Sequence, residues 1–178
     1  MASHAFRPAL PPREAPILQS GRLTLRPLSR ADWPAFRDFH ASDASGPVGG
    51  PIDAKGAWSL FAAGAGSWML DGHGWLAVDD GQGIAGLVGL LFPPHHHEPE
   101  IAWITFPHAR RRGYAAESAR TLLDWAWHET DRPRLVSYIE PGNAPSKAVA
   151  RRLGAVDTSA AATHDPDCTI WAHERPAA

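Results

Sequence analysis

The part of this chain that most constrains its fold is a strand-like run, a basic loop and a helical pattern in immediate succession. Residues 100–106 are strand-like, and residues 115–126 repeat apolar side chains at helical spacing. Between them lies Arg110-Arg111-Arg112-Gly113. A helix beginning there presents free backbone N–H groups and the positive end of its dipole, and a glycine allows close approach of a ligand. The segment favours phosphate binding over its alternative, a solvated arginine-rich turn.

The remaining residues alternate between strand and helix patterns in mixed order. The strands around residues 75–106 are linked by hairpins, which favours antiparallel pairing. The sequence therefore predicts an α+β domain with a mixed, largely antiparallel twisted sheet of about six to seven strands and about four helices. Strands are expected at residues 23–26, 75–78, 84–92, 100–106, 135–139, 155–163 and 168–173, and helices at residues 32–39, 54–63, 115–126 and 144–153.

One glycine pattern matches a dinucleotide-binding fingerprint by letter only. Gly81-Gln82-Gly83-Ile84-Ala85-Gly86 fits G-x-G-x-x-G. That fingerprint requires a helix after the glycines, whereas a second strand-like run follows here. Residues 79–83 are therefore predicted to be a hairpin turn.

Composition limits the partners and the compartment. The chain has 178 residues, of which 44% are hydrophobic, and a formal net charge of −2. This predicts one domain over residues 19–178, after a flexible tail at residues 1–18, with no attraction to nucleic acid or membrane. The tail has no apolar core of a signal peptide, and the apolar run Leu87–Phe92 is too short to span a bilayer. A single cysteine, Cys168, fits a cytoplasmic protein.

Four segments, in order and with suitable gaps, resemble one family over about residues 20–175. They resemble the RimJ/RimL-type ribosomal-protein N-acetyltransferases, a branch of the GNAT superfamily of acyl-CoA N-acyltransferases. The third of them resembles the pyrophosphate loop of that family, (Q/R)-x-x-G-x-(G/A). The segments are Arg22-Leu23-Thr24-Leu25-Arg26-Pro27-Leu28 before a helix at Asp32, Glu100-Ile101-Ala102-Trp103 before Pro107, Arg110-Arg111-Arg112-Gly113-Tyr114-Ala115-Ala116-Glu117, and Asn143-Ala144-Pro145-Ser146 before Leu153-Gly154.

The resemblance implies a GNAT-like fold and direct transfer of an acetyl group from acetyl-CoA to a primary amine, without a metal. The acceptor would be a protein N-terminal α-amine or a small-molecule amine, and exposed tryptophans are compatible with a homodimer. The residues that the resemblance assigns to binding of the cosubstrate are Ile104, Thr105, Phe106, Arg110, Arg111, Arg112, Gly113, Tyr114, Ala115, Asn143 and Ser146.

The sequence departs from the family pattern in two informative places. Arg111 stands where many members have glycine, a position that tolerates other residues. Ala150 stands where the superfamily often has a tyrosine, and the two tyrosines of the chain, Tyr114 and Tyr138, lie elsewhere. A tyrosine general acid is therefore not expected at that position. The same departure leaves room for a second class of function, a non-catalytic acyl-CoA-binding or regulatory module.

Two residues are the catalytic candidates. Glu100 could remove the proton of the acceptor ammonium, although water could also do so for an α-amine, whose reference pKa is ~7.7–8.0 against ~10.4 for lysine. The alternative for Glu100 is an exposed acid at a strand end. Ser146, by resemblance, would meet the departing thiolate, and its alternative is a hydroxyl at a helix N-terminus.

The remaining histidines, the cysteine and the tryptophans are not assigned catalytic roles. His95, His96 and His97 are expected in an exposed loop rather than a metal site, because no second ligand set has suitable spacing. His164 is a weaker candidate for the acceptor pocket, and Cys168 is expected to be a small buried hydrophobe. Among the eight tryptophans, Trp33, Trp58 and Trp68 fall where the family builds its acceptor site.

Overall fold

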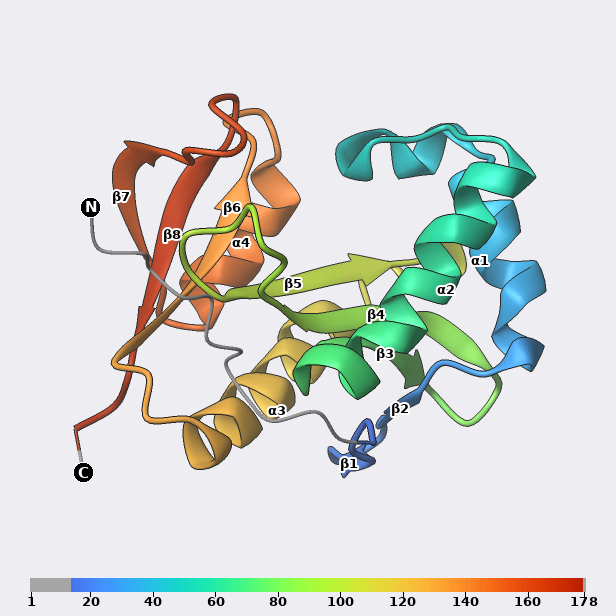
Figure 1. Cartoon of the computed structure of the whole chain (residues 1–178), viewed down its shortest axis with the longest axis horizontal. Helices are drawn as coiled ribbons and strands as arrows, with labels where there is room; N and C mark the ends of the chain where they lie inside the picture. The colour runs from blue at the N-terminus through green and yellow to red at the C-terminus, as the bar shows by residue number, and fades with distance from the viewer. Residues whose placement is uncertain (1–13, 178) are drawn as a thin grey trace.

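The fold is organised around one eight-stranded sheet. The computed structural model describes residues 14–177. The strand order is β1-β2-β3-β4-β5-β6-β8-β7, and every neighbouring pair is antiparallel except β5 and β6 (Figure 1). The strands are β1 (Leu18–Gln19), β2 (Thr24–Pro27), β3 (Gly74–Asp79), β4 (Ile84–Leu91), β5 (Glu100–Thr105), β6 (Arg134–Ile139), β7 (Val156–Ala161) and β8 (Thr169–Glu174).

The predicted fold class is confirmed, with one strand more than expected. The additional strand is β1, which is too short to give a sequence pattern and forms by pairing Leu18 with Leu25. Of the expected tail, residues 1–13 lie outside the described residues, and Leu18 belongs to this strand. No helix among residues 14–177 is long and apolar enough to cross a membrane.

Four α-helices and three 3₁₀ turns accompany the sheet within residues 14–177. The helix α2 continues to Asp71 rather than ending near Ala63, because small and apolar residues continue until Gly72 takes a left-handed φ of 69°. The loop expected after α1 contains a 3₁₀ turn. The helical elements are η1 (Arg30–Asp32), α1 (Trp33–His40), η2 (Asp43–Val48), α2 (Ala54–Asp71), η3 (Pro107–Ala109), α3 (Tyr114–Glu129) and α4 (Ala144–Arg152).

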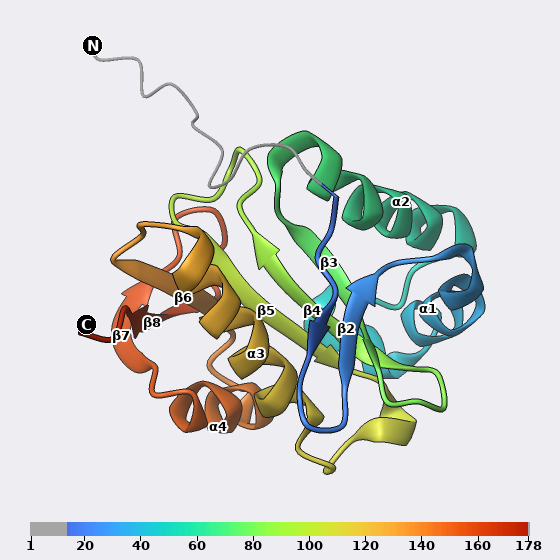
Figure 2. The same ribbon diagram turned by 90° about the horizontal axis from the view of Figure 1, so that it is seen from below.

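The core has a layer on each face of the sheet (Figure 2). On one face, Leu122, Leu123 and Ala126 of α3 pack with side chains of β3, β4 and β5. On the other face, Phe36 of α1 and Phe61 of α2 pack with alternate residues of the same strands. Each fully buried side chain of this size contributes on the order of 2 kcal/mol.

The sheet opens between its two parallel strands. Glu100 of β5 pairs with Val136 of β6, and the Val136 amide donates to the Pro99 carbonyl at 3.0 Å. At the next position the Ser137 hydroxyl, rather than a backbone amide, donates to the Ile101 carbonyl at 2.6 Å. The strands therefore separate beyond Glu100, and the later residues of β5 face open space on that edge.

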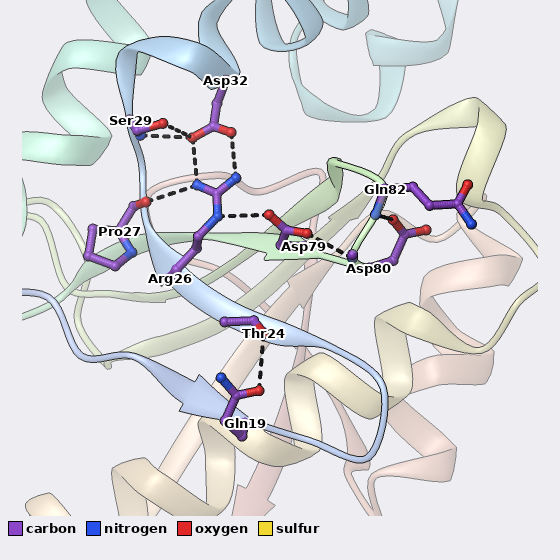
Figure 3. Close-up of polar contacts among 10 residues, drawn as sticks. Gln19, Thr24, Arg26, Pro27, Ser29, Asp32, Asp79, Asp80 and Gln82 are labelled. Carbon is purple, nitrogen blue, oxygen red and sulfur yellow. Dashed lines mark hydrogen bonds and ion pairs between the residues drawn. The ribbon is translucent and has the colours of Figure 1, made fainter.

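A partly buried ion-pair network, centred on the buried Asp32, fixes the entry to α1 (Figure 3). Arg26 of β2 donates to both carboxylate oxygens of Asp32 at 2.8 Å and to Asp79 of β3 at 2.9 Å. The Ser29 amide also donates to Asp32 at 2.8 Å. Burial would raise the pKa of Asp32, but the donors from Arg26 and Ser29 outweigh it and hold the pKa below its usual range.

We expect Arg26→Met to lower the free energy of unfolding by about 2–3 kcal/mol, because the Asp32 carboxylate would remain buried without its cation. Urea unfolding at pH 7 measures this change. The control is Arg37→Met, since Arg37 and its partner Asp38 have side chains that are 45% and 66% exposed and an exposed pair contributes within about 0.5 kcal/mol. Equal effects of the two changes would contradict the role of the network.

Candidate active site

Two clefts meet over β5. The first, of about 630 Å³, lies between the end of β5, the start of α3 and one face of α4, and is called the basic cleft. The second, of about 510 Å³, extends along β5 and β6 toward α1 and the β7–β8 loop, and is called the acidic cleft. The residues lining both clefts are Pro47, Val48, Trp103, Ile104, Asn143 and Ser146.

The basic cleft is lined by most of the residues predicted to bind the cosubstrate, namely Ile104, Thr105, Arg110, Arg111, Gly113, Tyr114, Ala115, Asn143 and Ser146. Phe106 and Arg112 are not among its lining residues. Phe106 is 2% exposed and stacks on Phe39. The Arg112 guanidinium lies 3.7 Å from Asp80, at the hairpin between β3 and β4.

The loop Arg110–Gly113 has an unusual backbone. Arg111 has φ 61° and Gly113 has φ 82°, both in the left-handed region. This explains why glycine suits the Arg111 position, since a non-glycine residue there costs on the order of 1 kcal/mol. Gly113 is also the N-cap of α3 and has no side chain that could accept from the first amides of the helix.

Arg22 holds this loop in place, a role that sequence reasoning did not assign. Its guanidinium donates to the Arg112 carbonyl at 2.6 Å and to the Glu117 carboxylate at 2.8 Å, and it lies over the Tyr114 ring. Ser20 donates to the same carboxylate at 2.7 Å. The segment before β2 therefore clamps both the loop and the first turns of α3.

The start of α4 lies at the junction of the two clefts. Asn143 caps the helix by accepting from the Ser146 amide at 3.1 Å, so it orders this loop, and the half-buried Ser146 lines both clefts. The same helix adds a cation that the sequence prediction missed. Arg152 lines the basic cleft, and helical spacing from Pro145 and Val149 could have identified it.

Glu100 lies in the acidic cleft where β5 and β6 are still paired. Its side chain is only 14% exposed. Burial raises the pKa of Glu100 to about 7, against a smaller opposing effect from the Tyr138 backbone N–H. The alternative of an exposed strand-end acid therefore does not describe this residue. Nearby, burial and then Glu100 raise the pKa of the Tyr138 phenol to about 12.

The charges of the two clefts are opposite. The basic cleft is lined by Arg110, Arg111 and Arg152, and no carboxylate of residues 14–177 lines it. The acidic cleft is lined by Glu100, Glu140 and Asp165, with no lysine or arginine from the described part of the chain. An anionic ligand is therefore favoured on one side of Ser146 and a cationic ligand on the other.

The tryptophans that line the site differ from those expected. Trp75 and Trp103 line the acidic cleft, whereas Trp33, Trp58 and Trp68 are not among its lining residues. Trp68 is 1% exposed and its indole N–H donates to the Trp75 carbonyl at 3.0 Å. The burial of Trp68 could not be predicted from the sequence, because α2 is apolar on all sides and the sequence pattern does not indicate which face packs against the sheet.

The remaining candidates are placed as follows. His164 lines the acidic cleft. Cys168 also lines it but is a buried thiol whose pKa is raised to about 12 by burial and by Asp165. His95 and His97 are exposed as expected, whereas the His96 side chain is 9% exposed. Within residues 14–177, no three His, Cys, Asp or Glu side chains are arranged to hold a metal ion.

Comparison with known proteins identifies the family. Residues 22–156 match the Acetyltransferase (GNAT) domain. An acetyltransferase from Agrobacterium tumefaciens str. C58 has a TM-score of 0.85 and 40% identity, with 91% of this chain and 96% of that chain covered. The uncharacterised N-acetyltransferase YnaD from Bacillus subtilis (strain 168) is 33% identical over 58 residues, which are 33% of this chain and 34% of YnaD. The matches to curated relatives thus span about a third to a half of their length.

Two further solved structures share the fold at lower identity. RimL, a ribosomal L7/L12 alpha-N-protein acetyltransferase, has a TM-score of 0.73 at 16% identity over 89% of this chain and 94% of that chain. Spermidine N-acetyltransferase from Vibrio cholerae, solved with CoA and spermine, has a TM-score of 0.71 at 17% identity over 88% and 97%. The chain belongs to the acetyltransferase (GNAT) domain family, as its resemblance to RimJ/RimL-type enzymes predicted. The reaction class of that family is acyl transfer.

We expect Gly113→Ala to weaken binding of CoA about tenfold, because a Cβ at φ 82° strains the loop by about 1 kcal/mol and would lie 3.4 Å from the Arg22 guanidinium that holds the loop in place. Titration calorimetry with CoA measures the loss. Gly66→Ala is the matched control, since a Cβ there meets open space within α2. Wild-type affinity in Gly113→Ala would contradict this use of the loop.

Proposed function

We propose that this protein is an acetyl-CoA-dependent N-acetyltransferase that moves an acetyl group directly to a primary amine. The observation that carries the proposal is the meeting of a basic and an acidic cleft at Ser146, beside the open edge of β5. An anionic thioester and a cationic amine would approach each other from opposite sides of that junction. The acetyl group would therefore pass directly from the cosubstrate to the acceptor, without a covalent acetyl-protein intermediate.

The basic cleft fits the anionic part of CoA. The first amides of α3, at Tyr114 and Ala115, are free of side-chain capping by Gly113 and would bind the pyrophosphate together with the helix dipole. Arg110, Arg111 and Arg152 would add charge-assisted hydrogen bonds.

The extended pantetheine arm fits the open edge of β5. Beyond Glu100 this edge is not occupied by β6, so backbone groups at Thr105 are available to an extended ligand, whereas those of Ile104 face Leu87 of β4. Asn143 orders the loop on the other side of the cleft. The thioester end of the arm would then lie near Ser146, at the entrance to the acidic cleft.

Glu100 suits the removal of a proton from the acceptor. A carboxyl with a pKa of about 7 is about half ionised at pH 7, and its carboxylate form is basic enough to accept a proton. Transfer from an α-amine of pKa ~8 is then uphill by only about 1 kcal/mol, against about 4–5 kcal/mol for a lysine amine of pKa ~10.4. This match favours α-amines, of a polypeptide or of a small molecule, as acceptors.

Ser146 suits the stabilisation of the departing thiolate. Its hydroxyl lies in the first turn of α4, where the helix dipole also favours negative charge. Ala150, at the position of the family's frequent tyrosine, is fully buried. Tyr138 lines the acidic cleft instead, but with a pKa of about 12 it remains protonated throughout the working range.

The pH–rate profile tests Glu100. For the wild type, kcat/KM with a free α-amine peptide should fall about tenfold for each pH step of one below pH ~7, because protonated Glu100 cannot accept a proton. In Glu100→Gln, kcat/KM at pH 7 should be lower by about 10²-fold or more. The decline at low pH that is assigned to Glu100 should also be absent from its profile. Glu140→Gln is the control, since it removes the same charge from the same cleft. An unchanged profile in Glu100→Gln would leave water as the base.

A separate measurement tests Ser146. Ser146→Ala should lower kcat by about 10-fold to 100-fold, since one hydrogen bond to a developing charge is worth about 1.5–3 kcal/mol. The KM for acetyl-CoA and the thermal stabilisation by CoA should change little, because most of the binding contacts remain. Turnover at the wild-type rate would show that the Ser146 hydroxyl has only a structural role at the N-terminus of α4.

The buried Ala150 favours one alternative, a non-catalytic acyl-CoA-binding or regulatory module. Thiol release from acetyl-CoA with a panel of α-amines and polyamines distinguishes the two functions. Thermal stabilisation by CoA without turnover on any amine would support the module.

A further inference from the structure

Four aromatic and histidine rings form a cluster beside Glu100, and the proposed reaction assigns them no role. The ring cluster consists of His95 and His96 from the β4–β5 loop, Tyr138 from β6 and His164 from the β7–β8 loop. His96 stacks on His164 with ring centroids 4.1 Å apart and an interplanar angle of 25°. Tyr138 meets His164 edge-on at 4.4 Å and His96 at 5.2 Å. The cluster thus joins three segments that are far apart in the sequence.

His96 is the member of the ring cluster that reaches the carboxylate. Its Nδ1 lies 3.7 Å from Glu100 Oε2, and the two side chains are 9% and 14% exposed. This Nδ1 is buried and has no hydrogen-bond partner among the described residues. Glu100 lines the acidic cleft, whereas His96 is not among its lining residues. A change at His96 therefore leaves the cleft lining itself intact.

Burial of both groups disfavours an ion pair at this contact. Burial lowers the pKa of His96 to about 4, with further lowering by His164 and His95, whereas burial raises the pKa of Glu100 to about 7. Between these values both groups are neutral, above them only Glu100 is charged, and below them only His96 is charged. The imidazole therefore faces Glu100 as a neutral ring throughout the pH range in which a base is needed.

The other groups around Glu100 do not supply a compensating cation. Tyr138 keeps its proton because its pKa is about 12. Burial lowers the pKa of His164, so this ring is neutral at pH 7, and the buried Cys168 keeps its thiol proton. Arg134 of β6 is held by Glu98 at 2.9 Å. Exclusion of water by neutral groups is thus the dominant influence on the carboxyl.

We propose that His96 is a positioning residue, whose neutral ring, backed by His164, keeps water from Glu100 and holds the carboxyl in its dry position. This function rests on the proposed role of Glu100 as the base. The triple-histidine loop then has one member with a defined task, while His95 and His97 remain at the surface. In this arrangement burial is the main cause that raises the pKa of Glu100.

Carboxyl NMR measures the effect without any turnover. In protein labelled with ¹³C at glutamate carboxyls, the signal lost in Glu100→Gln identifies Glu100, and its titration midpoint in the wild type should lie near 7. His96→Ala should admit water and lower the midpoint to about 5, toward the ~4.3 of an exposed glutamate. His96→Phe should keep the midpoint near 7, because an aromatic ring of similar size remains. His97→Ala, at an exposed neighbouring histidine, is the matched control and should also leave the midpoint unchanged.

Several outcomes would overturn the proposal. A midpoint near 7 in His96→Ala would show that other groups keep Glu100 dry, and a low midpoint in His96→Phe would show that the ring is not the cover. If His96→Ala does not fold, His96→Gln, with a polar and flexible side chain, should give the same fall.

The pH dependence of kcat/KM separates this inference from the proposed function. With acetyl-CoA and a free α-amine peptide, the low-pH decline should move with the NMR midpoint in each variant. If the Glu100 titration midpoint falls in His96→Ala while Glu100→Gln turns over at the wild-type rate, His96 positions Glu100 as proposed, but Glu100 is not the base. Loss of turnover in Glu100→Gln with an unchanged midpoint in His96→Ala would reject His96 alone.

Discussion

The hydrogen bond from the Ser137 hydroxyl to the Ile101 carbonyl is the contact on which the site depends. A buried carbonyl without a partner would cost about 1–3 kcal/mol, so strands of a sheet separate only where a substitute donor exists. Ser137 supplies that donor one step after Glu100 and Val136 have paired. Its proton is used toward Ile101, so the adjacent contact at 3.0 Å is donated by His173 Nε2–H, from a ring kept neutral by burial. The open edge of β5 and the junction of the two clefts follow from this separation.

One short segment fixes both walls of the site. Arg22 binds the carbonyl of Arg112 and the carboxylate of Glu117, which holds the arginine loop against α3. Four residues later, Arg26 binds Asp32 and Asp79 and fixes the start of α1, whose Phe36 lines the acidic cleft. Because both guanidiniums extend from the same segment, the basic loop and the wall of the acidic cleft at α1 are held in a fixed relation. Preorganisation of this kind would reduce the ordering cost of binding the two substrates of the proposed reaction.

The order of elements was predictable because it depends on local patterns. The arginine loop follows a strand and begins a helix, as the helix and strand periodicities indicated. Residues 79–83 form the predicted hairpin turn rather than a dinucleotide-binding loop. The short strand β1 and the full length of α2 were missed, since one depends on pairing with β2 and the other has apolar residues on every side. Most predicted residues of the cosubstrate site line the basic cleft because they come from two short stretches of the chain, residues 104–115 and 143–146.

The sequence by itself determined the family, the basic loop and the positions of Glu100 and Ser146 in the chain. Each of these is encoded within a few neighbouring residues. Only the tertiary structure decided that Trp75 rather than Trp58 lines the acidic cleft, that Arg22 clamps the loop, and that His96 and His164 stack beside Glu100. These relations join residues far apart in the chain, and the burial that raises the pKa of Glu100 arises only when all of its neighbours exclude water together.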